Sequence, residues 1–270
     1  MLYYETFSVY PLMHFNQIHT TVALLPPELS RRILRTADIE EQSRRAGAYI
    51  LLEKMLRKHA SDLLPSVKDL VKPEYTNFFE KRGALECVRY DSYGKPYFEG
   101  LENASFNLSH SGYMVACALN SAPHGEIAEQ VGVDIERVCL DTVRAERVAE
   151  RYFNEAEKAL LAPLLGDDEA FCRLFTRIWT KKEAILKYLG VGLTRISMAD
   201  STKPEEHGCF FIEDECIHAY TDFVDRKPKE ELYYVTVCAK IGEAVYKEAE
   251  NGEETPENGE NPAETSAENA

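Results

Sequence analysis

The 270-residue sequence lacks several features that would assign it to a special class of protein. It has no apolar run of the roughly 18 residues that a membrane span needs. Its first residues, MLYYETFSVYPLMHF, lack the basic start of a secretory signal peptide. Its seven cysteines are odd in number and form no CxxC pair, which argues against a zinc knuckle and a disulfide framework. We therefore expect a cytoplasmic protein with reduced thiols and no membrane contact.

Acidic residues outnumber basic ones, 46 to 31, and the excess of acidic charge is uneven along the chain. The formal charge is −15 at pH 7. Residues 249–270 contain seven Glu and no Lys, Arg, aromatic or branched aliphatic residue, so the rest of the chain carries −8. This composition predicts a disordered acidic tail over 249–270. An acidic body without a basic aromatic patch argues against a nucleic-acid partner.

The remaining chain shows the patterns of a mixed α+β protein with two halves. Apolar residues recur at helical spacing over 44–58, 144–151, 155–165 and 171–189, and Asn154 with Glu157 forms a capping-box pattern before the third of these. Strand patterns occupy 6–10, 113–119, 131–136, 209–212, 217–220 and 232–239. An apolar cluster at 86–90 runs into a turn signal at 91–96, and a polar connection passes through Pro26 and Pro27. We predict two similar α/β halves, residues 1–103 and 104–248.

The segment 131–136, VGVDIE, carries two carboxylates at alternate positions. In a strand, Asp134 and Glu136 share one face, opposite Val133 and Ile135. Two neighbouring carboxylates repel unless a cation lies between them. A solvated outer face of an edge strand is an equally good interpretation of this pair taken alone.

A second acidic group lies on the strongest helical pattern. Glu183 and Lys187, four residues apart, share a face beside the apolar stripe and near the only Trp, Trp179. Alone, they fit an exposed ion pair. A third carboxylate is also what a hard cation held by Asp134 and Glu136 would need, since Mg²⁺ prefers oxygen ligands.

The segment 106–112, FNLSHSG, precedes a predicted strand. A hydrolase would use a serine here with His110 as its base, but the sequence has no G-x-S-x-G elbow and adjacent Ser and His rarely face each other. His110 fits better as a ligand for phosphate. A structural loop histidine is the alternative.

These motifs together resemble those of one enzyme family. GKP at 94–96, FNLSHSG at 106–112, VGVDIE at 131–136 and WTKKEA at 179–184, followed by Lys187 and GVGL at 190–193, are similar to the motif series of the 4'-phosphopantetheinyl transferases of the surfactin-synthetase-activating type. The resemblance covers roughly residues 28–240. It implies a monomer of two similar halves with coenzyme A bound between them.

The resemblance implies a role for each matching residue. Asp134, Glu136 and Glu183 match the Mg²⁺ ligands, and Glu183 also matches the base proposed for the carrier serine. Lys187 matches the lysine that stabilises the departing 3',5'-ADP. Coenzyme A contacts are implied for Lys95, Ser109 and His110 and, through a looser alignment, for Arg44 and Arg45, with Arg32 a weaker candidate.

The implied partner is an apo acyl or peptidyl carrier protein, which receives phosphopantetheine on a serine. Fatty-acid, polyketide and nonribosomal-peptide carriers are equally compatible with these motifs. Because carriers are generally acidic, Arg144, Arg147 and Arg151 on one helical face are candidate docking residues, although a solvated helix face explains them equally well. Two other functions stay open at this point: a metal-dependent phosphodiesterase or nuclease, and a noncatalytic carrier-binding protein.

Overall fold

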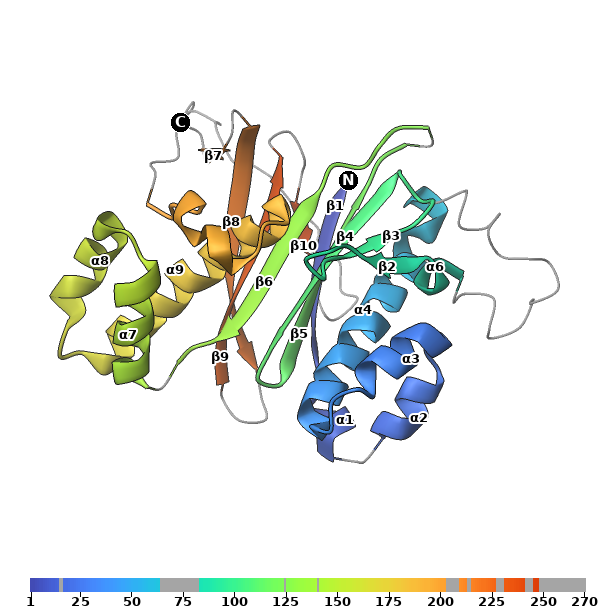
Figure 1. Cartoon of the computed structure of the whole chain (residues 1–270), viewed down its shortest axis with the longest axis horizontal. Helices are drawn as coiled ribbons and strands as arrows, with labels where there is room; N and C mark the ends of the chain where they lie inside the picture. The colour runs from blue at the N-terminus through green and yellow to red at the C-terminus, as the bar shows by residue number, and fades with distance from the viewer. Residues whose placement is uncertain are drawn as a thin grey trace, which may run out of the picture.

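The first of the two four-stranded sheets contains both early and late strands of the chain (Figure 1). Its order is β10-β1-β5-β4, formed by β1 (Leu2–Ser8), β4 (Ala104–Ser111), β5 (Met114–Ser121) and β10 (Val245–Lys247). Strand β5 runs antiparallel to β1 and β4 and is buried along its whole length.

The computed structural model describes residues 1–14, 17–63, 83–123, 125–139, 141–202, 209–212, 215–226, 231–240 and 245–247.

Helix α4 (Ile39–Leu63) covers one face of this sheet. Leu51, Leu52 and Met55 on α4 are fully buried in a core shared with β4 and β5. Smaller elements surround it: α1 (Tyr10–His14), α2 (Ile18–Ala23), α3 (Pro27–Ile33), α6 (Gly83–Glu86) and the hairpin of β2 (Val88–Tyr90) with β3 (Pro96–Phe98). This layer places the N-terminal part of α4 beside β4.

The second sheet has the order β6-β9-β8-β7. Its strands are β6 (Val131–Arg137), β7 (Cys209–Ile212), β8 (Glu215–Arg226) and β9 (Glu231–Lys240), all antiparallel to their neighbours. Helix α9 (Asp168–Leu189) packs on β6 and β9. Helices α7 (Thr142–Tyr152) and α8 (Glu155–Leu161) lie beside α9, followed by short 3₁₀ turns at Ala162–Leu164 and Leu193–Met198.

The two sheets pack face to face between the two long helices. Leu2 and Met114 of the first sheet share a buried cluster with Val133, Ile135 and Val235 of the second. In Figure 1 the strands accordingly lie in the middle, with α4 on one side and α9 on the other. The result is a helix-sheet-sheet-helix arrangement of the α+β class, as predicted.

The same topology occurs twice along the chain. In the first unit, β1 is followed by α4, β4 and β5, and the strands lie in the order β1-β5-β4. In the second, β6 is followed by α9, β8 and β9, and the order is β6-β9-β8. A strand, a long helix and an antiparallel pair are therefore arranged alike in both. Strands β4 and β5 lie after residue 103, so strands from both sides of the predicted boundary share the first sheet.

Several predicted element bounds are wrong. The first strand spans Leu2–Ser8 rather than 6–10, and three short helices occupy much of the expected polar connection. Pro27 opens one of them, because its fixed φ and missing N–H suit the first helical position. The helix predicted over 155–165 ends at Leu161, since Pro163 cannot donate a backbone hydrogen bond.

Other predictions are confirmed. Helix α9 ends where expected, with Gly190 in the left-handed region at φ 69°. The capping box of Asn154 and Glu157 is present at the start of α8. The predicted tail, 249–270, lies outside the described residues.

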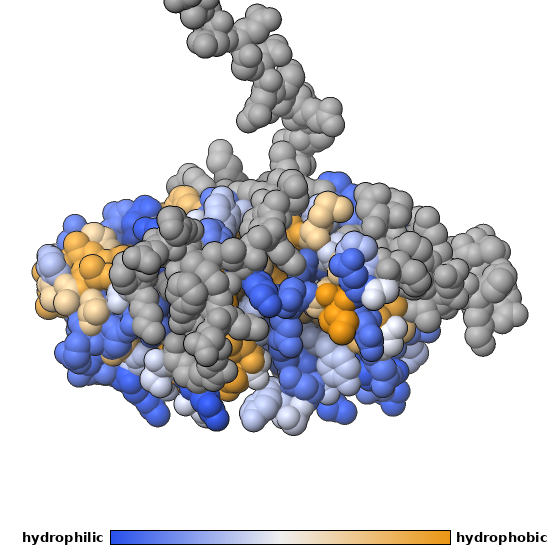
Figure 2. Space-filling view, turned by 90° about the horizontal axis from the view of Figure 1, so that it is seen from above, coloured by the Kyte–Doolittle hydropathy of each residue, from blue (hydrophilic) through white to orange (hydrophobic). Residues whose placement is uncertain are grey.

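The described surface is mainly polar. No helix in the described ranges is long and apolar enough to cross a membrane. Figure 2 shows apolar surface gathered at the end of the molecule that α7 and α8 form. Val143, Leu160 and Leu165 are exposed in this region.

Candidate active site

The two sheets are joined along β4 and β6, each the last strand of its sheet in the described structure. Side chains of β4 accept hydrogen bonds from backbone N–H groups at the edge of β6. Asn107 Oδ1 accepts from Val133 N–H at 3.1 Å, and Ser111 Oγ accepts from Arg137 N–H at 3.1 Å. Because side chains alternate along a strand, Ser109 faces β6 in the same way. An exposed strand edge is thus closed by side chains instead of a backbone ladder.

The same serines hold the carboxylates of β6. Ser109 Oγ donates to Asp134 Oδ1 at 2.8 Å, and Ser111 Oγ donates to Glu136 Oε2 at 2.7 Å. Asp134 is buried and Glu136 is half-buried. The prediction that Asp134 and Glu136 share a face is therefore confirmed, and that face is not a solvated outer surface.

Gly132 allows α9 to lie unusually close to β6. A Cβ at residue 132 would be 2.2 Å from the carbonyl oxygen of Ala184 and 2.5 Å from the backbone nitrogen of Tyr188. Only glycine fits this approach, which brings Glu183 and Lys187 of α9 to the carboxylates of β6.

Lys187 lies at the centre of this group. Its Nζ is 2.6 Å from Asp134 Oδ1 and 2.8 Å from Ser109 Oγ. Glu183 and Lys187 therefore do not form an isolated surface ion pair, because Lys187 pairs with a carboxylate from another element.

Burial and charge crowding change the acidity of both glutamates. Burial, and then the neighbouring Asp134 carboxylate, raise the pKa of Glu183 to about 7. The pKa of Glu136 is likewise raised to about 7, first by burial and then by Asp134, with Glu183 adding to the effect. At neutral pH these two groups are therefore poised between the protonated and charged forms.

The donor atoms suit a hard cation, although the side chains do not form a complete site as they stand. Among the described residues, no group of three or more His, Cys, Asp and Glu side chains is arranged to hold a metal ion. Asp134 Oδ2, however, is buried without a hydrogen-bond partner in the described structure. An unpaired buried carboxylate oxygen beside two further carboxylates fits an oxygen-coordinated divalent cation.

A basic cavity of about 430 Å³ lies on the opposite side of β4, against α4. Its lining includes the basic residues Arg32, Arg35, Arg45 and His110, the aromatic residues Tyr49 and Tyr90, and Glu41. The Arg32 guanidinium lies 3.7 Å from the centre of the Tyr90 ring. Cationic and aromatic groups together suit a phosphorylated ligand that carries a planar ring.

Glu41 partly neutralises this cavity. Its Oε1 accepts from Arg45 Nε at 2.7 Å and lies 3.8 Å from His110 Nε2. Burial alone would raise the pKa of Glu41, but the charge of His110 and the hydrogen bonds from Arg44 and Arg45 hold it below the ordinary value. Burial is the main factor that lowers the pKa of His110, with Lys187 and the arginines adding to it and Glu41 opposing.

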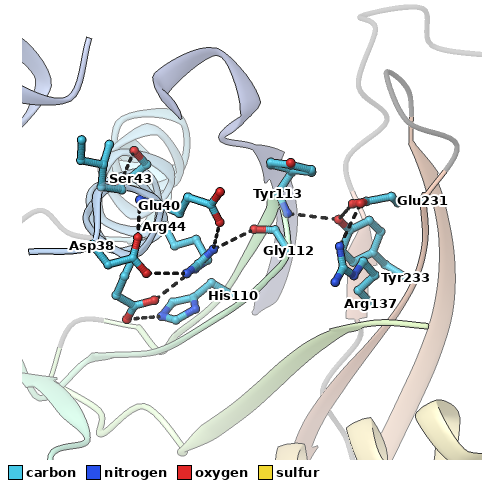
Figure 3. Close-up of polar contacts among 12 residues, drawn as sticks. Asp38, Glu40, Ser43, Arg44, His110, Gly112, Tyr113, Arg137, Glu231 and Tyr233 are labelled. Carbon is cyan, nitrogen blue, oxygen red and sulfur yellow. Dashed lines mark hydrogen bonds and ion pairs between the residues drawn. The ribbon is translucent and has the colours of Figure 1, made fainter. Parts of the chain in front are cut away.

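Arg44 occupies a different position from Arg45. Its guanidinium contacts Glu41 at 3.0 Å and Glu40 at 3.5 Å, and donates to the Gly112 carbonyl at 3.4 Å. Figure 3 shows that Arg44 reaches the β4–β5 turn, while Tyr233 contacts the other side of that turn. In the described structure Arg44 lies in a group of acidic residues and is not part of the cavity lining.

Lys95 is separated from His110. It lines a neighbouring cavity of about 540 Å³, and its Nζ donates to Gln130 Oε1 at 2.9 Å and to the Tyr188 carbonyl at 3.2 Å. Burial lowers its pKa to about 8, against the opposing effect of Asp91. Of the five residues matched to coenzyme A, only Arg45 and His110 therefore share one cavity.

A larger cavity, about 620 Å³, begins at Ser111 and Glu136. Tyr152, Phe175 and Trp179 give it aromatic walls, and Arg144 of α7 lies at its lining. It connects the carboxylate group to the surface that carries the predicted docking arginines.

Sequence analysis missed the roles of several residues. Asn107 and Ser111 fall in a recognised motif, and strand alternation could have placed them with Ser109. Glu41 had no sequence signal. Lys182 could have been noticed, because a charge at this position interrupts the apolar stripe of Ile178 and Ile185.

Comparison with known proteins identifies part of the chain. Residues 130–238 match the model of the 4'-phosphopantetheinyl transferase superfamily. The chain is 31% identical over 147 residues to the 4'-phosphopantetheinyl transferase Sfp of Bacillus subtilis strain 168, covering 54% of this chain and 60% of that protein. It is 37% identical over 110 residues to the 4'-phosphopantetheinyl transferase HetI of a Nostoc strain, covering 40% of this chain and 43% of that protein.

The resemblance seen in the motifs is thereby confirmed over residues 130–238, which match the model of the 4'-phosphopantetheinyl transferase superfamily. The matched part contains Asp134, Glu136, Glu183 and Lys187 but none of the residues matched to coenzyme A. The chain spans about 60% of the length of the Bacillus subtilis relative.

Proposed function

We propose that this protein transfers the 4'-phosphopantetheine group of coenzyme A to a serine of an apo acyl or peptidyl carrier protein and releases 3',5'-ADP. The observation that supports this most directly is the meeting of Asp134, Glu136, Glu183 and Lys187 within the family-matched segment, next to a basic cavity. A phosphodiesterase could use the same carboxylates, but the family match favours the transferase. A noncatalytic carrier-binding protein would not need all four groups.

Asp134, Glu136 and Glu183 would hold Mg²⁺, as the orphaned Asp134 Oδ2 and the oxygen donor set suggest. When bound, Mg²⁺ neutralises the diphosphate and fixes its orientation. Because the pKa values of Glu136 and Glu183 are raised to about 7, Mg²⁺ competes with protons at this site and should bind more weakly below pH 7.

Lys187 supplies the second positive charge. In the absence of ligand it pairs with Asp134, and on substrate binding its ammonium can turn to the phosphate of the departing nucleotide. Glu183 would take the proton of the attacking serine hydroxyl. Its pKa of about 7 belongs to the metal-free site, and bound Mg²⁺ would lower that pKa and make Glu183 a weaker base. A water held by the carboxylates is the alternative base.

The basic cavity would bind the nucleotide of coenzyme A. Arg45 and His110 line it and can contact the 3'-phosphate, provided that Glu41 turns away or is outweighed by the surrounding cations. Ser109, between this cavity and the carboxylates, would join the contacts to the diphosphate. Lys95 and Arg44 would have to leave their present partners to take part.

The carrier would approach the side of α7. Arg144, Arg147 and Arg151 are exposed, and exposed apolar residues lie nearby on the α7–α8 end. A charged and apolar surface beside the cavity at Glu136 suits an acidic carrier that carries its serine inward. The repeated topology supports a monomer of two related halves, and we propose that it acts in the cytoplasm.

The test is incubation with coenzyme A, Mg²⁺ and a panel of apo carrier proteins, read by intact mass. A mass gain equal to phosphopantetheine on the carrier is expected, and none when the acceptor serine is replaced by alanine. The variant Glu183→Gln should abolish the gain. Absence of modification across fatty-acid, polyketide and nonribosomal-peptide carriers would contradict the proposal.

A further inference from the structure

One charged pair of the molecule is completely buried next to the active-site glutamate. Lys182 of α9 is 1% exposed and Glu157 of α8 is 0% exposed. Lys182 Nζ donates to Glu157 Oε1 at 2.9 Å, to Oε2 at 2.8 Å and to the Ala199 carbonyl at 2.5 Å. All three ammonium donors therefore have an acceptor.

Glu157 is itself fixed from several sides. Its Oε2 accepts from the Asn154 N–H at 2.9 Å in the capping box of α8, and its Oε1 accepts from the Ser201 N–H at 2.9 Å. Lys182 is thus tied to the start of α8 and to the segment that follows α9. Together these hydrogen bonds hold the Lys182–Glu157 ion pair in a single geometry.

Stability alone does not account for such a pair. The cost of removing two charges from water commonly equals or exceeds their mutual attraction, and apolar replacements of buried pairs are often neutral or stabilising. What the pair supplies is a directional constraint, which apolar packing at the same position would not give.

That constraint acts on the face of α9 that carries the chemistry. Successive side chains of a helix are rotated by about 100° about its axis, so the Glu183 side chain is rotated by that angle from the Lys182 side chain. Lys187, four residues after Glu183, lies on nearly the same face as Glu183. The close contact of Gly132 with the backbone of Ala184 and Tyr188 holds one face of α9 against β6. The three contacts of Lys182 add a directional constraint on the rotation of α9 about its own axis.

We propose that Lys182, clamped by Glu157 and the Ala199 carbonyl, is a positioning residue that sets the rotation of α9 and thereby aims Glu183 and Lys187 at Asp134. This inference rests on the proposed transferase function. At a helix radius of about 5–6 Å, a rotation of ~10° moves a carboxylate by ~1 Å. A displacement of ~1 Å at a reacting group can lower the rate about 10²-fold.

The experiment compares the wild type with the double variant Lys182→Met/Glu157→Gln. Methionine keeps an unbranched chain of similar length, and the side-chain oxygen of glutamine can still accept from the Asn154 N–H. The matched control is Arg173→Met/Glu169→Gln, which removes the exposed i,i+4 pair from the same helix. Each protein is assayed for Mn²⁺ binding by electron paramagnetic resonance, for thermal midpoint, and for kcat and KM of transfer.

We expect the double variant to melt within a few degrees of the wild type, to bind Mn²⁺ about tenfold more weakly, and to lose about 10²-fold in kcat with KM for coenzyme A nearly unchanged. The control should match the wild type in all assays. Wild-type Mn²⁺ affinity and kcat in the double variant would overturn the inference.

If the double variant does not fold, the single variant Glu157→Gln is assayed in its place. We expect it to show a smaller loss in kcat and in Mn²⁺ affinity. If neither variant folds, the pair is needed for folding and the positioning role is overturned. The Mn²⁺ measurement does not depend on a carrier, so absence of transfer in the wild type with intact Mn²⁺ binding would count against the proposed function only. A wild type that binds no Mn²⁺ would overturn both.

Discussion

The substitution Glu183→Gln tests the charge crowding at the active site directly, through the pH dependence of stability without metal. The pKa of Glu183 is raised from 4.5 to about 7, first by burial and then by Asp134. Between these two values the folded protein keeps a proton that the unfolded chain has released. The stability linked to this group is therefore complete below pH 4.5 and is lost as pH rises through 7.

The magnitude follows from the size of the displacement. A pKa raised by this much corresponds to about 3 kcal/mol of unfolding free energy between the two pH limits. Because Glu183 keeps some solvent contact and Lys187 opposes the shift, we expect about 1–3 kcal/mol. Glutamine removes the charge but keeps the shape of the side chain. The loss of unfolding free energy with rising pH should therefore disappear in the variant. Removing Glu183 should also lower the pKa of Glu136.

The assay is thermal or urea unfolding at pH 5 and pH 8 in the presence of a chelator. At pH 8 the variant should be more stable than the wild type, by roughly 2–12 °C in thermal midpoint, and at pH 5 the two should nearly coincide. Glu169→Gln, an exposed carboxylate on the same helix, is the control and should show no such divergence. Equal pH dependence in the wild type and Glu183→Gln would refute the reasoning.

Three further predictions can be tested independently. Gly132→Ala should destabilise the protein by about 1–3 kcal/mol and impair transfer, measured by urea unfolding and kcat, because the new methyl group would meet the backbone of α9; wild-type values would contradict the close approach. His110→Ala should reduce the preference for coenzyme A over its dephospho form, measured as the ratio of kcat/KM for the two substrates, whereas Lys187→Ala should slow transfer from both substrates alike. An unchanged preference in His110→Ala would show that His110 does not contact the 3'-phosphate. Deletion of 249–270 should leave transfer unchanged, since that segment has no motif residue, and a loss above about tenfold would contradict this.

The sequence alone determined the class of fold and the chemical groups of the site. Helical and strand periodicities located α9, β6 and the end of β9, because these long elements each bury one face and so carry a regular pattern. The short helices between residues 10 and 33 escaped prediction because a few turns carry too little periodicity. The paired carboxylates of β6 and the Glu183–Lys187 spacing followed from the periods of strand and helix.

Only the tertiary structure decided how these groups meet. No local pattern shows that Asn107, Ser109 and Ser111 close the edge of β6, that Gly132 admits the backbone of α9, or that Lys187 pairs with Asp134 rather than Glu183. These are contacts between residues 25 to 56 positions apart, set by the packing of the sheets and of α9 against one another. The separation of Lys95 from His110 and the burial of Lys182 with Glu157 arise in the same way, because periodicity fixes which way a side chain points but not what stands opposite it.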